Sequence, residues 1–420
     1  MWNQMITNRA PLEKESKRMK SIQLFVICII VCISSAVAQD STVVNTYRFG
    51  YYNQYDLRNS STNALFIHRY SNDLFNDVVR PKMGEKTGNL AFGVFSFAST
   101  YMSMIWSHEF GHSLRAAQVG GHFKIHNAAL PIPYTTMELP DSIDLVDESL
   151  SVTGGFEVNY LNVRTIQSDF IRNNGSSNVS LAFAFANRIM FPLYTSVIVP
   201  IDAEDPDVWI NTAGDPVHVI LPVWTNYSDG QVFMADNSVN PDLVDFYGEA
   251  VLLATYFNLL DPHFYKEVAA SFGDEKVERK PIWLIGDHSN GWIYGTMFNV
   301  SPLGYELYLN NYIHLNGNQF SLYFKTGRPF KNNGAGLAWN NIAETDKYNV
   351  SASLETWDQD IFGSGIAGEA TLEYKLSQNL GIVTSAGYKT EGYILGKQIA
   401  EGFNWSLGVQ IFHQPTQSKN

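Results

Sequence analysis

The sequence has 420 residues, of which 45% are hydrophobic and 16% are charged, and its formal net charge at pH 7 is −13. The charged share is low beside the roughly 25% of a typical soluble domain. The acidic balance excludes a nucleic-acid-binding protein, because such a protein needs a basic face to neutralise phosphates. Aromatic residues make up 14% of the chain, a bias that is typical of β-rich and membrane-interface proteins.

Residues 1–38 are expected to be an N-terminal extension followed by a signal peptide. Lys20 precedes the apolar run SIQLFVICIIVCISS, and AVA at 36–38 provides a cleavage site. The only two cysteines, Cys28 and Cys32, lie inside this run. We therefore expect an exported protein without disulfides or thiolate ligands, located in the periplasm or the outer membrane of the cell envelope.

Residues 39–87 are expected to form an N-terminal strand and loop region, since the aromatic-rich segment TVVNTYRFGYYNQYD favours a strand. Residues 88–280 are expected to form a helical domain. Its first helix starts near Gly88 with a long uncharged run, NLAFGVFSFASTYMSMIW, continues through His108–His112 and ends at the stop signal Gly120-Gly121.

Further helices are predicted in the same domain. A second helix is expected after Gly154-Gly155, and a third apolar segment covers 181–199. The stretch 201–240 is rich in Asp, Asn and Pro, which favours an irregular excursion over packed helices. Asn240-Pro241 then predicts a helix start, because asparagine is a good N-cap and proline fits the first helical position.

Residues 281–420 are expected to be an antiparallel β domain, so that the fold class is α+β. Apolar and polar residues alternate in YNVSASLETW, EATLEYKL and FNWSLGVQI, and Asn316-Gly317 predicts a tight hairpin. Strands of about ten residues, rich in aromatics, are typical of an outer-membrane β-barrel. Such barrels usually end on an aromatic residue, whereas here HQPTQSKN follows Phe412, so a soluble sheet packed on the helices stays open.

The segment HEFGH at residues 108–112 lies on the first predicted helix. His108 and His112 are one turn apart, so both imidazoles project from one face and can hold one metal ion, predicted to be Zn2+. Glu109 lies beside them and is the predicted catalytic base, which would activate a zinc-bound water. The alternative is two helix histidines without a metal, one bonded to a neighbouring group and one exposed.

HEFGHSLRAAQVGG, residues 108–121, resembles the active-site helix of gluzincin metallopeptidases. It is also similar to the motif of the site-two intramembrane proteases, His-Glu-x-Gly-His followed by small residues and a glycine. The resemblance covers about thirty residues. It implies that His108 and His112 are zinc ligands, that Glu109 is the catalytic base and that the reaction is peptide hydrolysis.

The third zinc ligand is expected to be a carboxylate. Glu157, in TGGFEVNYL, is the first choice, since gluzincins take this ligand from a glutamate on a following helix. Asp261, in YFNLLDP, is similar to the aspartate ligand of the intramembrane proteases, although the glycine pair that follows it there is missing. Glu249, a lone carboxylate on an apolar segment, is the third choice.

Three hypotheses follow for the function. The first is a zinc metallopeptidase of the bacterial envelope that acts on a peptide or protein substrate. The second is a non-catalytic outer-membrane or envelope protein, in contact with outer-membrane lipid, whose metal site is structural; a fourth ligand such as His126 would favour it. The third is an intramembrane zinc protease, in which 91–107 and 181–199 face lipid.

Overall fold

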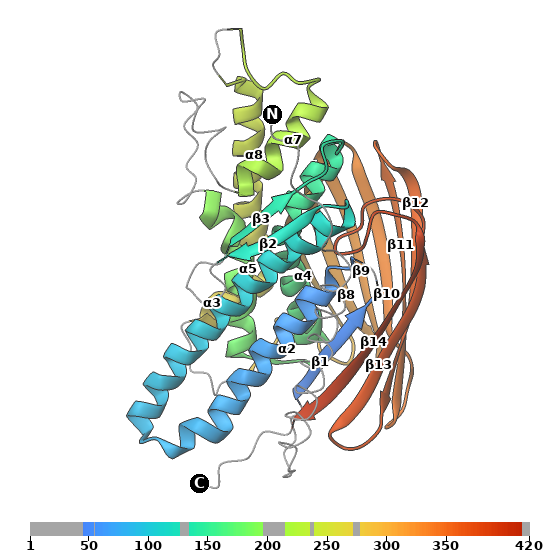
Figure 1. The fold of residues 1–420 in the computed structure, drawn as a ribbon. Helices are drawn as coiled ribbons and strands as arrows, with labels where there is room; N and C mark the ends of the chain where they lie inside the picture. Colours follow the sequence, from blue (N-terminus) through green and yellow to red (C-terminus); the bar gives the residue numbers. More distant parts are fainter. Residues whose placement is uncertain are drawn as a thin grey trace, which may run out of the picture.

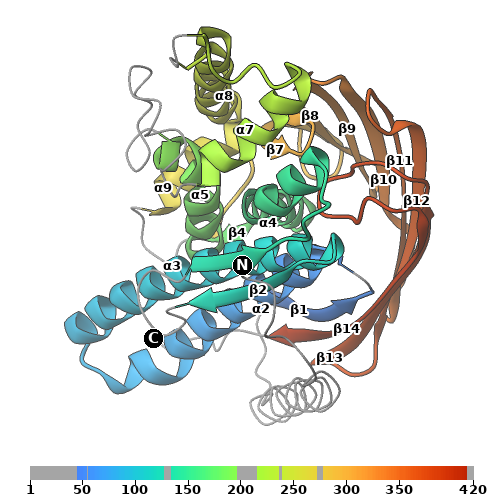
Figure 2. The same ribbon diagram turned by 45° about the horizontal axis from the view of Figure 1, so that its top comes forward.

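The structure is a computed structural model that describes residues 45–53, 55–126, 134–195, 215–235, 239–271 and 278–413. The predicted signal peptide lies outside the described residues. The fold is α+β, as the sequence predicts: a helical part is followed by a large antiparallel sheet (Figure 1). The sheet curves, and the helices lie on its concave side (Figure 2).

The sheet has ten strands in the order β1-β14-β13-β12-β11-β10-β9-β8-β7-β6, so the strand at the N-terminus pairs with the strand at the C-terminus. The turn between β8 and β9 is the predicted hairpin, and both of its central residues have the positive φ that a type I′ turn requires, 51° at Asn316 and 82° at Gly317. The bounds are β1 (Asn45–Tyr52), β6 (Ile285–Gly286), β7 (Gly291–Ser301), β8 (Gly304–Leu315), β9 (Asn318–Pro329), β10 (Asn332–Glu344), β11 (Tyr348–Gln359), β12 (Gly363–Lys375), β13 (Leu380–Lys389) and β14 (Gly402–His413).

In the sequence, the helices follow β1 and precede the other strands of the large sheet. A π-helical turn (Phe75–Val79) and a 3-10 turn (Arg80–Lys82) join the first two helices, and three short two-stranded pairings accompany the others. The bounds are α2 (Arg58–Leu74), α3 (Glu85–Gln118), β2 (His122–His126), β3 (Tyr134–Glu138), α4 (Leu145–Arg172), β4 (Ser176–Ser177), α5 (Asn178–Leu193), α7 (Asp215–Tyr227), α8 (Pro241–Leu260), α9 (Pro262–Ser271) and β5 (Glu278–Arg279).

Three local predictions differ from the structure. Much of the predicted strand and loop region 39–87 is helix α2, and the predicted excursion 201–240 contains helix α7. Helix α4 starts ten residues before the predicted point, because Asp144 caps it by accepting a hydrogen bond from the Asp147 amide. Gly154-Gly155 therefore lies inside the helix and not before it.

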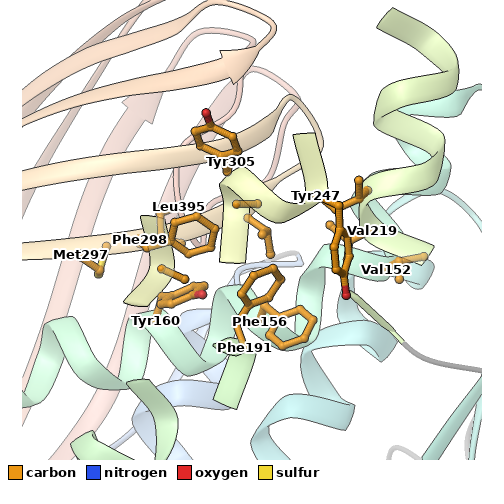
Figure 3. Packing of buried hydrophobic residues seen from close by; sticks show 14 of the residues in the cluster. Val152, Phe156, Tyr160, Phe191, Val219, Tyr247, Met297, Phe298, Tyr305 and Leu395 are labelled. Atoms are coloured by element: carbon orange, nitrogen blue, oxygen red, sulfur yellow. The ribbon is translucent and has the colours of Figure 1, made fainter. Parts of the chain in front are cut away.

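The largest hydrophobic core lies between the helices and strands β7, β8 and β9 of the sheet (Figure 3). Phe156 of α4 packs edge-to-face on Phe191 of α5, and Phe191 in turn contacts Phe298 of β7 with ring centroids 5.2 Å apart. These aromatic contacts fix α4 against both α5 and the sheet, and α4 carries residues that surround the HEFGH segment.

The sheet carries its apolar residues on the outside. On β14, Phe403, Trp405 and Leu407 are exposed, whereas Asn404 and Ser406 between them are buried. On the neighbouring strands, Leu354, Ile366, Leu372 and Ile382 are also exposed. This polarity is the reverse of a soluble sheet packed on helices, in which the apolar face points inward.

Ion pairs fill the inner side of the same strands. Lys325 contacts Glu306 at 2.6 Å, and Lys397 contacts Glu355 at 2.8 Å. Arg58 of α2 reaches Glu369 of β12 at 2.8 Å. All of these side chains are mostly or fully buried. The charges of the sheet are thus satisfied inside the protein.

Aromatic residues mark both ends of the outer face. Tyr348 lies opposite Tyr374 at one end of the strands, and Tyr388 lies opposite Phe403 at the other end. All four side chains are exposed, and the exposed aliphatic residues Leu372 and Leu407 lie between the two levels in the strand register. Two aromatic belts around an aliphatic band are typical of a protein surface that crosses a lipid bilayer.

Candidate metal centre

Helices α3 and α4 cross in direct backbone contact beside the HEFGH segment. A Cβ atom at Gly111 would come within 3.0 Å of the carbonyl of Gly154, and a Cβ at Gly154 would meet the carbonyl of Gly111 in the same way. At the next position, a Cβ at Gly155 would come within 3.0 Å of the Nε2 atoms of both His108 and His112. The glycines therefore bring the two imidazoles against the backbone of α4.

The structure brings His108 and His112 together as the spacing predicts. Their Nε2 atoms lie 3.1 Å apart, their ring centroids are 4.8 Å apart, and both residues are 3% exposed. Phe156 closes one side, with its ring edge-to-face on His108. The two ring nitrogens that a metal would use thus face each other in the buried crossing of α3 and α4.

The opposite nitrogen of each ring has an acceptor. His112 Nδ1 lies 3.3 Å from the carbonyl oxygen of Ser151, and His108 Nδ1 lies 2.7 Å from Asn159 Oδ1. A backbone carbonyl can only accept, so the Nδ1 of His112 carries the proton. The Nε2 atom of neutral His112 then presents its lone pair towards His108.

A chain of amides gives His108 the same tautomer. Asn187 Nδ2 donates to the carbonyl of Phe183, so Asn187 Oδ1 is an acceptor, and it takes the bond from Asn159 Nδ2 at 2.8 Å. Asn159 Oδ1 consequently faces His108 and accepts from its Nδ1. Two Nε2 lone pairs at 3.1 Å repel each other unless a cation or a shared proton lies between them.

This arrangement fits two ligands of a metal ion. Two imidazole nitrogens, each about 2.0–2.1 Å from one tetrahedral zinc, are about 3.3 Å apart, which is close to the 3.1 Å seen here. An Nδ1–H that donates to a carbonyl or amide oxygen is also the usual support of a metal-bound histidine. Within the described ranges, no group of three or more His, Cys, Asp or Glu side chains could hold a metal, so a third ligand is not found among these residues.

Glu109, the predicted base, is 8% exposed on the same helix. Its carboxylate makes no hydrogen bond or ion pair to the part of the chain that the structure describes, while its backbone carbonyl accepts from Ser113 Oγ and from Thr135 Oγ1 of β3. The β2–β3 hairpin therefore lies along α3 at the level of Glu109. Such a carboxylate is available to take up a proton.

Glu157, the first choice for a third ligand, is placed elsewhere. Its two carboxylate oxygens face Arg115, which donates from Nε and Nη2 at 2.7 Å each, and Oε1 also accepts from the hydroxyl of Tyr393 at 2.7 Å. Arg115 and Glu157 are both fully buried. The structure does not bring Glu157 together with His108 and His112, and its role as a ligand stays a prediction.

The other candidate ligands are also committed to separate contacts. Asp261 pairs with Arg188 at 3.1 Å and accepts from His263 Nδ1 at 2.8 Å. Glu249 forms an exposed pair with Arg328. His126 bonds Thr136 and stacks on Tyr134, within the β2–β3 hairpin. The residues that do surround the histidine pair, Asn159 and the carbonyl of Ser151, are ones that the sequence alone did not single out.

No protein-family model and no curated protein matches the chain. Among solved structures, it is similar to an anion-selective porin from Comamonas acidovorans, with 12% identity over 30% of this chain and a TM-score of 0.23. It is also similar to OmpT of Vibrio cholerae, with 13% identity over 30% of this chain and a TM-score of 0.20. The chain spans about half the length of these structures, 48% and 50%. Similarity this distant does not identify a family.

Proposed function

We propose that this chain is an integral protein of the bacterial outer membrane, with the outer face of the sheet in contact with lipid. The observation that carries the proposal is the reversed polarity of the sheet: Leu354 and Leu407 are 51% and 55% exposed, while Glu306, Lys325 and Glu355 are paired on the inner side. Strands β7 to β14 have 10 to 13 residues, enough to cross the hydrocarbon layer when tilted.

The variant Leu354→Arg tests lipid contact. Leu354 is at the middle of β11, opposite the exposed Leu337 of β10. In phosphatidylcholine vesicles, the charge is expected to lower the free energy of unfolding by about 2–4 kcal/mol, because a mid-bilayer arginine loses its hydration. The measurement is urea unfolding followed by tryptophan fluorescence.

The control is Ser364→Arg, at the exposed start of β12 next to the turn from β11, which we expect to change stability by less than about 0.5 kcal/mol. A soluble sheet would give the same small effect at both positions. Equal stabilities of the two variants would therefore contradict the membrane proposal.

We further propose that His108 and His112 hold a metal ion, with zinc as the first candidate. The facing Nε2 atoms and the two Nδ1 acceptors support this part of the proposal. When bound, zinc would supply a Lewis acid that polarises a carbonyl group. Gly155 leaves the space beside both rings that a side chain would otherwise fill.

Peptide hydrolysis is the candidate reaction, and the position of Glu109 beside His108 in the sequence is the observation that favours it. Glu109 directly follows His108 on α3, is 8% exposed and would accept a proton and pass it to a leaving amine. The substrate class is a peptide or a protein. Loss of hydrolysis in Glu109→Gln with unchanged metal binding would support this role, and retained hydrolysis would contradict it.

Asn159 offers a test of the metal site that does not depend on activity. Asn159→Leu removes the acceptor that holds His108 Nδ1–H, and we expect zinc to bind about 10–100-fold more weakly. Asn159→Asp should retain tight binding, because an aspartate oxygen also accepts from Nδ1. The measurement is zinc titration against a competing chelator, with 15N NMR to report which ring nitrogen carries the proton.

The control variant is Asn162→Ala. Asn162 donates to the same oxygen of Asn187 but is bonded to Ser61 and Ser107 and not to His108. Its zinc affinity should match that of the unmodified protein. Wild-type affinity in Asn159→Leu would show that the His108 contact has no part in metal binding.

A further inference from the structure

Among the described residues, the ten-stranded sheet does not close on itself, because β1 and β6 form its two edges and do not pair. Beyond the two-residue strand β6, most of β7 is also an edge. Unpaired backbone groups at an edge attract further strands in water, and each costs several kcal/mol within a bilayer. An open sheet in a membrane therefore needs other groups at its edges.

Side chains of α2 bind the free edge of β1. Asn63 Nδ2 donates to the carbonyl of Gly50 and its Oδ1 accepts from the Gly50 amide, both at 3.0 Å. One turn earlier, Asn59 makes the same pair of bonds with Tyr52, at 2.7 and 2.9 Å. Two asparagines at a spacing of four residues on the helix thus bond two alternate residues of the strand, as a neighbouring strand would do.

A buried ion pair binds the opposite edge. At Thr296 of β7, the backbone amide donates to Asp261 Oδ2 and the carbonyl accepts from Arg188 Nη1, both at 3.2 Å. The side chain of Thr296 also donates to the carbonyl of Phe257 near the end of α8. Asp261 follows α8 directly and Arg188 belongs to α5, so helices cover this edge as well.

The helices next to these edges carry exposed apolar faces. On α3, which packs on α2, Leu90, Val94 and Phe97 lie on one exposed face, and Phe97 is 75% exposed. On α8, which packs on β7, Leu252, Tyr256 and Leu259 are exposed. By length and composition, α3 and α8 are also the two described helices that could cross a membrane.

The helices with exposed apolar residues lie near the two ends of the sheet. Figure 2 shows the sheet as an arc with α8 near the β7 end and with α2 and α3 near the β1 end. The exposed acidic residues of α8, Asp242 and Asp245, lie in its first half, whereas its exposed residues from Leu252 to Leu260 are mostly apolar. The apolar half is the one that reaches Thr296 in the middle of β7.

We propose that helices α3 and α8 complete the membrane wall that the sheet leaves open, so that lipid acyl chains contact these helices as well as the strands. This inference rests on the proposed insertion of the sheet into a membrane. A second copy of the chain is less well suited to these edges, because it would have to add a strand there. The backbone groups that such a strand would pair with already bind side chains of Asn59, Asn63, Asp261 and Arg188.

Quenching by brominated lipid tests the proposal. In a full chain with Cys28→Ser and Cys32→Ser, single variants Phe97→Cys and Leu252→Cys are labelled with bimane and placed in phosphatidylcholine vesicles with brominated acyl chains. Leu354→Cys reports on the sheet, and Ser364→Cys, at the start of β12 next to the turn, is the control expected to lie in water. Val94→Cys and Tyr256→Cys replace either helix variant that does not fold.

Quenching of the helix labels within about twofold of that at Leu354→Cys, with little at Ser364→Cys, is the expected result. Quenching at Leu354→Cys alone would overturn the inference and leave the sheet in the membrane. Cross-linking of Phe97→Cys or Leu252→Cys between chains, without quenching, would overturn it in favour of a second copy. Absence of quenching at Leu354→Cys would overturn the proposed function itself.

Discussion

Gly111→Ala is expected to destabilise the protein by about 3 kcal/mol or more. Alanine is normally the better helix residue, so this substitution would stabilise an unhindered helix by about 0.5–1 kcal/mol. At Gly111, however, the new Cβ would come within 3.0 Å of the carbonyl carbon and oxygen of Gly154. These are backbone atoms, so the whole of α4 must move away from α3, and the histidine pair moves with it.

The matched control is Gly93→Ala on the same helix, where an added Cβ would meet nothing within 4 Å. Gly93 is exposed, and its replacement should leave stability unchanged or raise it. The measurement is the midpoint of urea unfolding for both variants in the same vesicles. Equal stability of Gly111→Ala and Gly93→Ala would contradict the close backbone contact between α3 and α4 at Gly111.

Glu157→Gln is expected to lower the free energy of unfolding by about 3–5 kcal/mol while leaving zinc binding intact. The carboxylate is fully buried, and its two oxygens accept hydrogen bonds from Nε and Nη2 of Arg115. Glutamine removes the negative charge and turns one acceptor into a donor. The variant therefore leaves a cation without its counter-charge in the protein interior.

The exposed pair Arg328–Glu249 supplies the control, because Glu249→Gln should cost less than about 1 kcal/mol. Stability is measured by urea unfolding and zinc by titration of the folded proteins. Loss of zinc binding in Glu157→Gln, with a stability like that of Glu249→Gln, would mean that Glu157 is a metal ligand and that its contact with Arg115 is secondary.

Local patterns made much of the fold predictable. The helix predicted from Gly88 to the stop signal Gly120-Gly121 is α3 (Glu85–Gln118), the Asn316-Gly317 turn joins β8 to β9, and the period-two segments are strands. The period of a strand does not say which face is buried, however. The proposal that the sheet faces lipid rests on the positions of Glu306 and Lys325 on the inner side, which the sequence alone does not give.

Contacts between distant parts of the chain were beyond the sequence. Gly154-Gly155 has the composition of a helix boundary, yet its function is to let α3 and α4 touch, which depends on Gly111 more than forty residues away. Glu157 was attractive as a ligand because it follows these glycines. Nothing in the local sequence indicates that Arg115 lies opposite it and takes both carboxylate oxygens.

The metal content of the protein, extracted from membranes without a chelator, tests the proposed centre most directly. Mass spectrometry of the folded chain should find about one zinc per chain, and X-ray absorption should show imidazole nitrogens at about 2.0–2.1 Å. His112→Ala should lose the metal while staying in the membrane. A folded wild-type protein without any bound metal would contradict the account and leave a buried histidine pair that shares a proton.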